Sequence, residues 1–451
     1  MAMRASGPGR SPTRRTYLQG AALIGVAAAA CQPLGRPAPA APQAVSFPAE
    51  MTWMPWSAAN EWLAPTYQQV ADAFSQHHPG TKLTILAVPT DWLVKLKTMI
   101  AAGTPPDVSD VHHNGQVRDL GTSGQVMDLT PFLKRDPYPK SYMGWEPWAW
   151  LKKQYGIPWA LQSTAIFYNK QLFDAAGARY PTDTWTWDDF VEAAKRLTKP
   201  GADDNSTIWG AGDQGGTNYQ WINALLVAFG GGVLSSDYTE CTLTSSASLA
   251  GLEFRAGWGS KLRITRNVAG GTSGQFTSGN FAMVTSGSWF VANVKQSSQS
   301  RLVTSNIPWD VAPVPKGKAR RAALAYELGV GIPSGVRSPD ASWAVIRYLT
   351  STEALVPFAR IGRILPPDRG LWNETIPADG QPAGFKHAFL DFWDEINIVP
   401  PFVPHWPDVD AMWQDELNAV WTGDRPPKDG ATAFKTRMDQ HLAQLKRDGL
   451  L

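Results

Sequence analysis

Strand-like and helix-like segments alternate along this chain, and their order constrains the fold more than any other feature. Residues 51–53 precede a helical pattern over residues 67–74, residues 82–88 have the pattern of a strand, and helical spacing returns over residues 92–100. Similar helical patterns follow at residues 190–197, 341–349 and 434–445. This βαβ order predicts an α/β architecture with parallel strands.

The first thirty residues have the features of an export signal. A twin-arginine stretch at residues 13–19 is followed by ten apolar residues, 21–30, and small residues directly precede Cys31. Ten apolar residues are too few to span a bilayer, and crowding of Gly, Pro, Ser and Arg over residues 4–15 disfavours the alternative of a buried helix. The pattern is typical of a Tat-type signal with a lipoprotein cleavage site. We therefore expect residues 1–30 to be removed, Cys31 to be lipidated, and the Pro- and Ala-rich residues 31–43 to form a tether.

Removal of the signal leaves a nearly balanced charge and a long mature chain. Residues 1–30 carry four arginines and no acidic residue, so the mature chain has 37 of the 41 basic residues and all 39 acidic ones. This nearly neutral balance does not suggest nucleic-acid binding. The 421 remaining residues exceed what one core usually supports, which predicts two lobes. Only Cys241 is left unmodified, which excludes an internal disulfide and a Cys-rich metal site. We expect no cofactor, no transmembrane helix after residue 30, and a monomer.

Residues 155–190 carry a series of short motifs in a specific order. They are Gly156-Ile157-Pro158, Tyr168-Asn169-Lys170, Leu172-Phe173, Ala176-Gly177 and the ending Pro181, Thr184-Trp185, Phe190. Further landmarks are GTPPDV (103–108), FTSGNFAMVTSGSW (276–289), DVAPVPKG (310–317), residues 329–332 and GRILP (362–366). Over residues 44–451 the chain resembles the family 1 extracellular solute-binding proteins of ABC importers, the group that includes maltose-binding protein.

The resemblance implies a two-lobed fold of the periplasmic-binding-protein type (type II), with hinge strands and a central ligand crevice. Lobe one would comprise residues 44–158 plus 307–352, and lobe two residues 159–306 plus 353–451. Such a protein is not an enzyme. It captures a solute by lobe closure and delivers it to the permease subunits of an ABC importer, here from an extracytoplasmic position anchored to the membrane by the lipid on Cys31.

Tryptophan content narrows the expected ligand. The chain has 21 tryptophans, more than packing alone requires, because a Trp is rarely fully buried and its N–H needs a partner. An indole face matches the C–H face of a sugar ring, while polar side chains supply directed hydrogen bonds to hydroxyl groups. We therefore expect some tryptophans to be exposed in the crevice and the ligand to be a mono- or oligosaccharide.

The resemblance also implies which residues contact the ligand. Those on the expected crevice loops are Trp53, Trp56, Ser57, Asp110, His112, His113, Asn114, Gln162, Asn218, Tyr219, Trp221, Ser288, Trp289, Glu327, Arg363, Trp406 and Trp413. Trp289 is the foremost candidate, because Gly287-Ser288-Trp289 matches a family position where an aromatic residue of lobe two faces the crevice. Gln162 stands where maltose-binding protein carries a glutamate, and the amide keeps an acceptor while adding donors.

Several of these residues have alternative roles. His112 and His113 could each cap a turn, Trp413 could be a helix core residue, and Trp289 could pack beneath the loop of residues 285–288. Other ligands on the same fold also remain open: a peptide, a polyamine, or a glycerol phosphate ester, for which Arg363 would supply the cation. A secreted glycoside hydrolase is a remote alternative, because the acid pairs Asp188-Asp189 and Asp408-Asp410 lie in no hydrolase motif.

Overall fold

A nine-stranded sheet runs through the part of the chain that the structure describes. The computed structural model describes residues 45–112, 115–213, 216–266, 276–299, 307–376 and 381–451. The strands follow the order β2-β1-β3-β10-β6-β8-β7, with β11 beside β10 and β9 beside β6. Their bounds are β1 Glu50–Met54, β2 Lys82–Ile85, β3 Val108–His112, β6 Ile157–Asn169, β7 Gly212–Asp213, β8 Met283–Gly287, β9 Trp309–Pro313, β10 Ala323–Gly331 and β11 Asn397–Ile398. A separate ribbon pairs β4 Ala149–Trp150 with β5 Lys153–Gln154.

The α/β fold is confirmed, but the prediction that its strands are parallel is only partly right. β1 pairs in parallel with β2 and β3, and β7 with β8. By contrast, β10 is antiparallel to β3 and β6, and β6 is antiparallel to β8 and β9. The reason is the route of the chain. It passes along β6, whose first half pairs with β10 and whose second half pairs with β8 and β9, and it returns along β10 in the opposite direction. All thirteen residues of β6 are buried.

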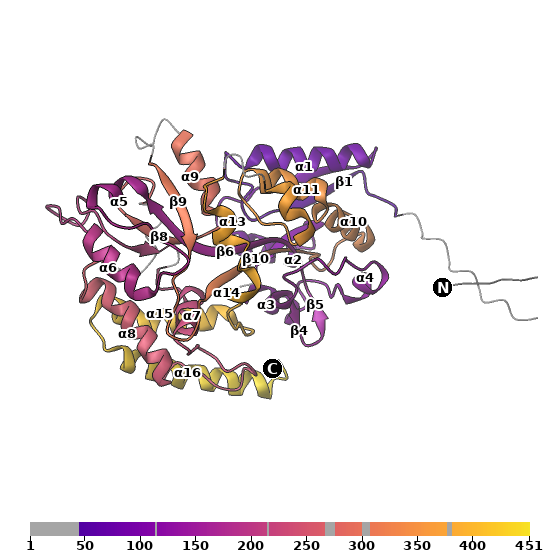
Figure 1. Ribbon diagram of the computed structural model, residues 1–451. Coiled ribbons are helices and arrows are strands. Elements are labelled where there is room, and N and C mark those ends of the chain that lie inside the picture. The colour runs from indigo at the N-terminus through magenta and orange to yellow at the C-terminus, as the bar shows by residue number, and fades with distance from the viewer. Residues whose placement is uncertain (1–44, 113–114, 214–215, 267–275, 300–306, 377–380) are drawn as a thin grey trace, which may run out of the picture. The chain divides into compact units, whose positions relative to one another are not determined.

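The helices pack in two groups of hydrophobic cores. The N-terminal cores gather residues of α1, α10 and α11 around Trp53, and residues of α2 and α3 around Met54. The C-terminal cores gather α7, α8, α15 and α16, then α9 and α13, then α5 and α6. In Figure 1, α1, α10 and α11 lie together at the upper right, and α8, α15 and α16 lie together at the bottom. The helix bounds are α1 Ala64–His77, α2 Trp92–Ala101, α3 Gln116–Thr122, α4 Thr130–Arg135, η1 Glu146–Trp148, α5 Lys170–Ala176, α6 Trp187–Leu197, α7 Tyr219–Ala228, α8 Ser246–Ser260, α9 Phe290–Gln299, α10 Pro339–Leu349, α11 Thr352–Arg360, η3 Arg369–Leu371, α12 Trp372–Thr375, α13 Phe385–Phe389, α14 Trp393–Ile396, α15 Trp406–Thr422 and α16 Pro427–Arg447.

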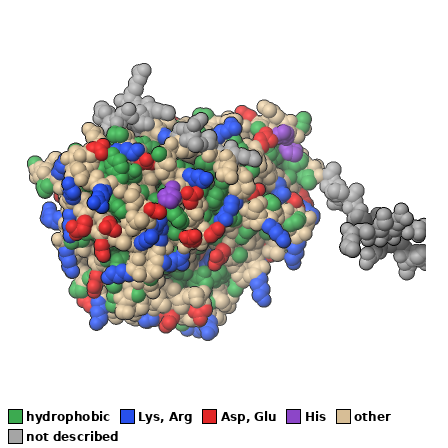
Figure 2. Space-filling view, viewed as in Figure 1, with side chains coloured by type: hydrophobic (Ala, Val, Ile, Leu, Met, Phe, Trp, Pro, Cys, Tyr) green, Lys and Arg blue, Asp and Glu red, His purple; other side chains and the backbone are tan. Residues whose placement is uncertain are grey.

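The helices predicted from apolar spacing are confirmed. In α1 the four residues predicted to share a face, Tyr67, Val70, Ala71 and Phe74, are its buried residues. In α6 the face predicted from apolar spacing is also buried. This helix begins with a capping box, in which the side chains of Thr186 and Asp189 each accept a hydrogen bond from the other's backbone N–H. On the face seen in Figure 2, acidic and basic side chains are interspersed. Among the described residues, no helix combines the length and apolar character needed to cross a membrane.

The two groups of cores touch through α3 and the first turn of α15. The Asp119 carboxylate on α3 accepts hydrogen bonds from the backbone N–H groups of His405 and Trp406, the latter at 3.2 Å, and so caps α15. Gly115 has φ +84°, and a Cβ there would lie 2.4 Å from the Cβ of Trp406, so the close approach requires glycine. Beside it, the guanidinium of Arg118 lies 4.1 Å from the ring centroid of Trp150.

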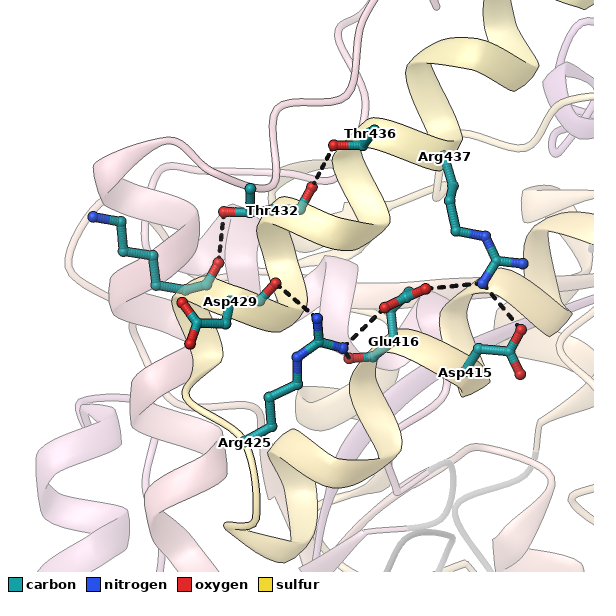
Figure 3. A network of polar contacts seen from close by, with 8 residues as sticks. Asp415, Glu416, Arg425, Asp429, Thr432, Thr436 and Arg437 are labelled. Atoms are coloured by element: carbon teal, nitrogen blue, oxygen red, sulfur yellow. Dashed lines mark hydrogen bonds and ion pairs between the residues drawn. The ribbon is translucent and has the colours of Figure 1, made fainter.

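A network of charged side chains joins α15 to α16 (Figure 3). Glu416 lies between two arginines, with 2.9 Å from its carboxylate oxygens to Arg425 Nη1 and to Arg437 Nη1. Arg437 also contacts Asp415 at 3.0 Å, and Arg425 donates to the carbonyl of Asp429. Because the Glu416 side chain is only 17% exposed, its ion pairs are less screened than pairs on the open surface.

Replacing Glu416 tests whether this network stabilises the packing of α15 on α16. Hydrogen bonding to Arg425 lowers the pKa of Glu416, so its stabilisation is complete above the ordinary glutamate pKa and is lost as the pH falls through the lower folded value. We expect Glu416→Gln to lower the free energy of unfolding by about 1 kcal/mol at pH 7, and by progressively less below about pH 4. Urea denaturation at several pH values measures this. Glu192→Gln, which breaks an exposed pair with Lys195, is the control and should change less; equal losses in both variants would contradict the account.

Candidate ligand-binding site

Two neighbouring parallel strands place several of the predicted residues at one edge of the sheet. Trp53 of β1 pairs with Val108 of β3, and Asp110 and His112 follow on β3 while Trp56 and Ser57 follow β1. The carboxyl ends of parallel strands meet at the same edge, which is where open α/β sheets bind ligands. The structure therefore brings these five residues together.

A buried carboxylate ties the two strand ends to each other. Asp110 is fully buried, and its Oδ1 accepts a hydrogen bond from Trp53 Nε1 at 3.3 Å while its Oδ2 accepts one from the backbone N–H of Trp56 at 2.8 Å. Burial raises the pKa of Asp110 to about 7, although both hydrogen bonds and the nearby Arg363 guanidinium favour the ionised form.

A chain of hydrogen bonds extends from this edge to the central strands. Arg363 Nη2 donates to Ser57 Oγ at 3.2 Å, and Ser57 Oγ shares a 2.8 Å hydrogen bond with Tyr67 OH. Gln162 Nε2 on β6 donates to the carbonyl of Arg363 at 3.4 Å. Two predicted residues that are far from Ser57 in sequence, Gln162 and Arg363, are thereby connected to it.

Trp56 is the most open aromatic residue of this region. Its side chain is 40% exposed, more than that of any other tryptophan that the structure describes. Its ring centroid lies 4.0 Å from that of His112 and 5.5 Å from that of Trp92, in tilted and edge-on arrangements. These contacts hold the ring in place and leave part of it exposed.

A cavity of about 280 Å³ opens beside Trp56. Its lining comprises Trp56, Ser57, Ala59, Asn60, Val88, Pro89, Thr90, Asp91 and Trp92. The contribution of residues 88–92 was missed from sequence. A signal existed, since this segment connects a predicted strand to a predicted helix and so belongs to the same edge of the sheet as Trp56. Asp91 adopts the left-handed conformation, φ 52°, directly before α2.

The candidates around residue 288 lie next to the central strand β6. The carbonyl of Ser163 on β6 accepts a 2.8 Å hydrogen bond from the backbone N–H of Ser288, whose side chain is buried. Trp289 is half-buried against a C-terminal core, and its ring covers Gly287, where a Cβ would come within 1.7 Å of it. Glu327 on β10 lies opposite Leu161, and burial raises its pKa to about 8, with Glu146 adding to the effect.

The remaining lobe-two candidates divide between a core and a second cavity. Tyr219, Trp406 and Trp413 are buried among α7, α15 and α16, and Trp413 Nε1 donates to the carbonyl of Thr217 at 2.7 Å. No ring face of Trp413 is open in this arrangement, as expected for a helix core residue. Asn218 is exposed at the start of α7.

Three other residues named from the sequence, His113, Asn114 and Cys31, lie outside the described residues.

The second cavity, about 50 Å³, lies beside a buried ion pair. Trp221 lines it together with Thr164 of β6. Arg255 donates to Asp213 Oδ2 from Nε at 3.1 Å and from Nη2 at 2.9 Å. Burial raises the pKa of Asp213, whereas Arg255 acts against this shift. Sequence reasoning found Trp221 but missed the ion pair, because its partners are 42 residues apart.

Comparison with known proteins identifies the family. The family model described as bacterial extracellular solute-binding protein matches residues 60–356. The chain belongs to this family. It is therefore an extracellular solute-binding protein and not an enzyme, as its sequence motifs predicted.

Relatives of this solute-binding protein include one whose name states its ligand. It is 26% identical over 387 residues to the maltooligosaccharide ABC transporter solute-binding lipoprotein of Streptococcus pneumoniae, which covers 81% of this chain and 82% of the relative. It is 22% identical over 374 residues to a putative binding protein of Brucella abortus, covering 80% of this chain and 86% of the relative.

Solved structures share the fold. An ABC substrate-binding protein from Listeria monocytogenes, in complex with cycloalternan, matches with a TM-score of 0.76 and 21% identity, covering 87% of this chain and 99% of the other. The maltose/maltodextrin-binding domain MalE from Bdellovibrio bacteriovorus, bound to maltotriose, matches with a TM-score of 0.70 and 17% identity, covering 87% and 100%. The predicted resemblance to maltose-binding proteins is confirmed at the level of fold.

Proposed function

We propose that this protein binds a carbohydrate outside the cytoplasm and delivers it to the permease of an ABC importer. The observation that carries the proposal is the exposed ring of Trp56 at the mouth of a cavity with polar walls. A flat apolar face beside hydrogen-bonding groups fits a pyranose, which has C–H faces and a rim of hydroxyl groups. The relatives that bind maltooligosaccharides, cycloalternan and maltotriose support the same ligand class.

The surroundings of Arg363 favour a neutral sugar over a phosphate ester. A phosphate site needs a cation directed at the ligand. Here the Arg363 guanidinium donates to Ser57 and lies beside the Asp110 carboxylate, which compensates its charge. The cation therefore supports the loop after β1. Besides Ser57, the polar groups at the cavity wall are the hydroxyl of Thr90, the amide of Asn60 and the carboxylate of Asp91.

Export and anchoring are part of the proposal. The twin-arginine stretch and the small residues before Cys31 support Tat-type export followed by lipidation of Cys31. The Streptococcus pneumoniae relative is itself named a lipoprotein. A lipid anchor on Cys31 would keep the binding protein beside its permease.

We further propose that the two groups of cores are lobes that close on the ligand. Two contacts favour a shift in the boundaries predicted from sequence. β9 pairs with the second half of β6, so residues 309–313 pack with lobe two rather than lobe one. Conversely, residues 354–364 contribute to the N-terminal core around Trp53, which favours placing them in lobe one.

Substitution of Trp56 tests the proposed sugar-stacking surface. Trp56→Ala removes an apolar contact on the order of 2 kcal/mol, so maltotriose binding measured by calorimetry should weaken about 30-fold while the melting temperature changes little. Tyr180→Ala, which truncates another exposed aromatic residue at 36% exposure, is the control and should bind as the unsubstituted protein does. Unchanged affinity in Trp56→Ala would remove Trp56 from the site.

Trp289→Ala belongs in the same experiment. If Trp289 stacks on a sugar ring, its variant should also lose affinity with little loss of stability. If it packs beneath the loop of residues 285–288, the melting temperature should fall and the affinity should stay.

The Asp119 cap provides a test of lobe closure. Asp119→Ala should weaken the contact between α3 and α15 by about 1 kcal/mol and so favour the open form. The radius of gyration of the ligand-free protein should therefore rise, and the sugar affinity should fall several-fold. Small-angle scattering and calorimetry measure the two effects. Asp128→Ala is the matched control, because the Asp128 carboxylate accepts the backbone N–H of Thr130 at the start of α4, within the N-terminal half. An unchanged radius in Asp119→Ala, or an equal increase in both variants, would contradict the account.

A further inference from the structure

A buried acid is hydrogen-bonded to the backbone of Trp56, the most exposed tryptophan among the described residues. Asp110 has no exposed surface, and its two oxygens accept hydrogen bonds from the side chain of Trp53 and from the backbone of Trp56. The indole of Trp53 is itself buried in a core. The carboxylate therefore connects a fixed tryptophan to an exposed one, three residues later in the chain.

Among the described residues, three other ionisable groups lie around this carboxylate. The Arg363 guanidinium, three residues after the end of α11, lies close enough to stabilise the negative charge of Asp110. Burial raises the pKa of the Tyr67 hydroxyl on α1, and the negative charge of Asp110 adds to this shift. On β3 itself, His112 is two residues away, on the same side of the strand as Asp110, and its ring contacts Trp56. A pH dependence of this loop therefore has to be tested against His112 as well as Asp110.

We propose that Asp110 is a positioning residue, which does not touch the ligand but holds the backbone at Trp56 so that the indole faces the cavity. This proposal rests on the sugar-binding function proposed above. It differs from the sequence-based expectation, in which Asp110 contacts the ligand directly. A group with no exposed surface and both oxygens engaged within the protein can act on a ligand only through the residues that it holds.

The same geometry makes the loop sensitive to pH near neutrality. Burial raises the pKa of Asp110 to about 7, so the folded protein takes up a proton here well above the ordinary aspartate range. A protonated carboxyl is a weaker acceptor for two N–H donors and no longer balances Arg363. Sugar affinity should therefore rise with pH through about 7. The stability contribution has the opposite sign, because a raised carboxyl pKa makes ionisation costly in the folded state as the pH increases from about 4 to 7.

Amide hydrogen exchange of the loop tests the positioning role without any ligand. In Asp110→Asn one amide oxygen cannot serve both tryptophan donors, and in Asp110→Ala neither donor has its acceptor. We expect the peptide containing the Trp56 amide to exchange faster at pH 8, by several-fold in the Asn variant and at least tenfold in the Ala variant. If the Ala variant fails to fold, the Asn variant and the pH dependence of the unsubstituted protein carry the test.

Asp107→Asn is the matched control. The Asp107 carboxylate also accepts a backbone N–H from β1 at 2.8 Å, that of Thr52, but at the opposite end of the same pair of strands. This variant should leave both the exchange at Trp56 and the sugar affinity unchanged. Exchange at Trp56 that is unaltered in Asp110→Asn and Asp110→Ala, or accelerated equally in Asp107→Asn, would overturn the proposal.

Calorimetry with maltotriose then links the position of the loop to binding. Asp110→Asn should weaken binding about tenfold at pH 8, the loss expected for one hydrogen bond to a charged group, and should abolish the rise in affinity between pH 6 and pH 8. A rise that persists in Asp110→Asn would assign the pH dependence to a group other than Asp110 and contradict the proposal. Failure of the unsubstituted protein to bind any sugar would instead refute the proposed function, while the exchange experiment would still decide the role of Asp110.

Discussion

The long antiparallel pair of β6 and β10 is the element on which the rest of the structure depends. β6 is buried along its whole length and exchanges partners midway, from β10 at Ser163 to β8 at Thr164. The Gln162 side chain is hydrogen-bonded to Arg363, which is in turn hydrogen-bonded to Ser57 after β1. The Ser163 carbonyl accepts a hydrogen bond from the backbone N–H of Ser288, and Thr164 lines the cavity next to Asp213. Three consecutive residues thus connect both halves of the candidate site, so a small bend at this point would move the halves relative to each other.

Around that strand the site combines one exposed apolar surface with a buried polar support. Trp56 gains its position from a backbone hydrogen bond to Asp110, and Ser57 gains its position from Arg363 and Tyr67. Hydrogen bonds to ionised groups are stronger than those between neutral groups, which suits a loop that must stay in place while its aromatic side chain faces water. The cost is a carboxylate held in an apolar environment, which explains the raised pKa of Asp110.

Sequence reasoning predicted the local elements well and the long-range arrangement less well. Apolar spacing predicted the buried faces of α1, α6 and α16, because that spacing follows directly from helix geometry. The expectation of parallel strands was wrong for β6 and β10, because strand pairing depends on the path of the chain and not on the local sequence pattern. Within the site, the motif order pointed to Trp56 and Asp110, yet burial separated their roles. The contribution of residues 88–92 and the pair of Asp213 with Arg255 depend on contacts between distant segments, which one sequence does not reveal.

The central claim is that a sugar covers the exposed face of Trp56, and oxidative footprinting tests it most directly. Hydroxyl radicals label accessible tryptophan rings, and mass spectrometry reports the rate of oxidation at each position. In the ligand-free protein Trp56 should be labelled faster than the buried Trp413. At a saturating concentration of a sugar whose binding has been measured independently, the account predicts strong protection of Trp56 with little change at Trp413. Undiminished oxidation of Trp56 at demonstrated saturation would contradict it.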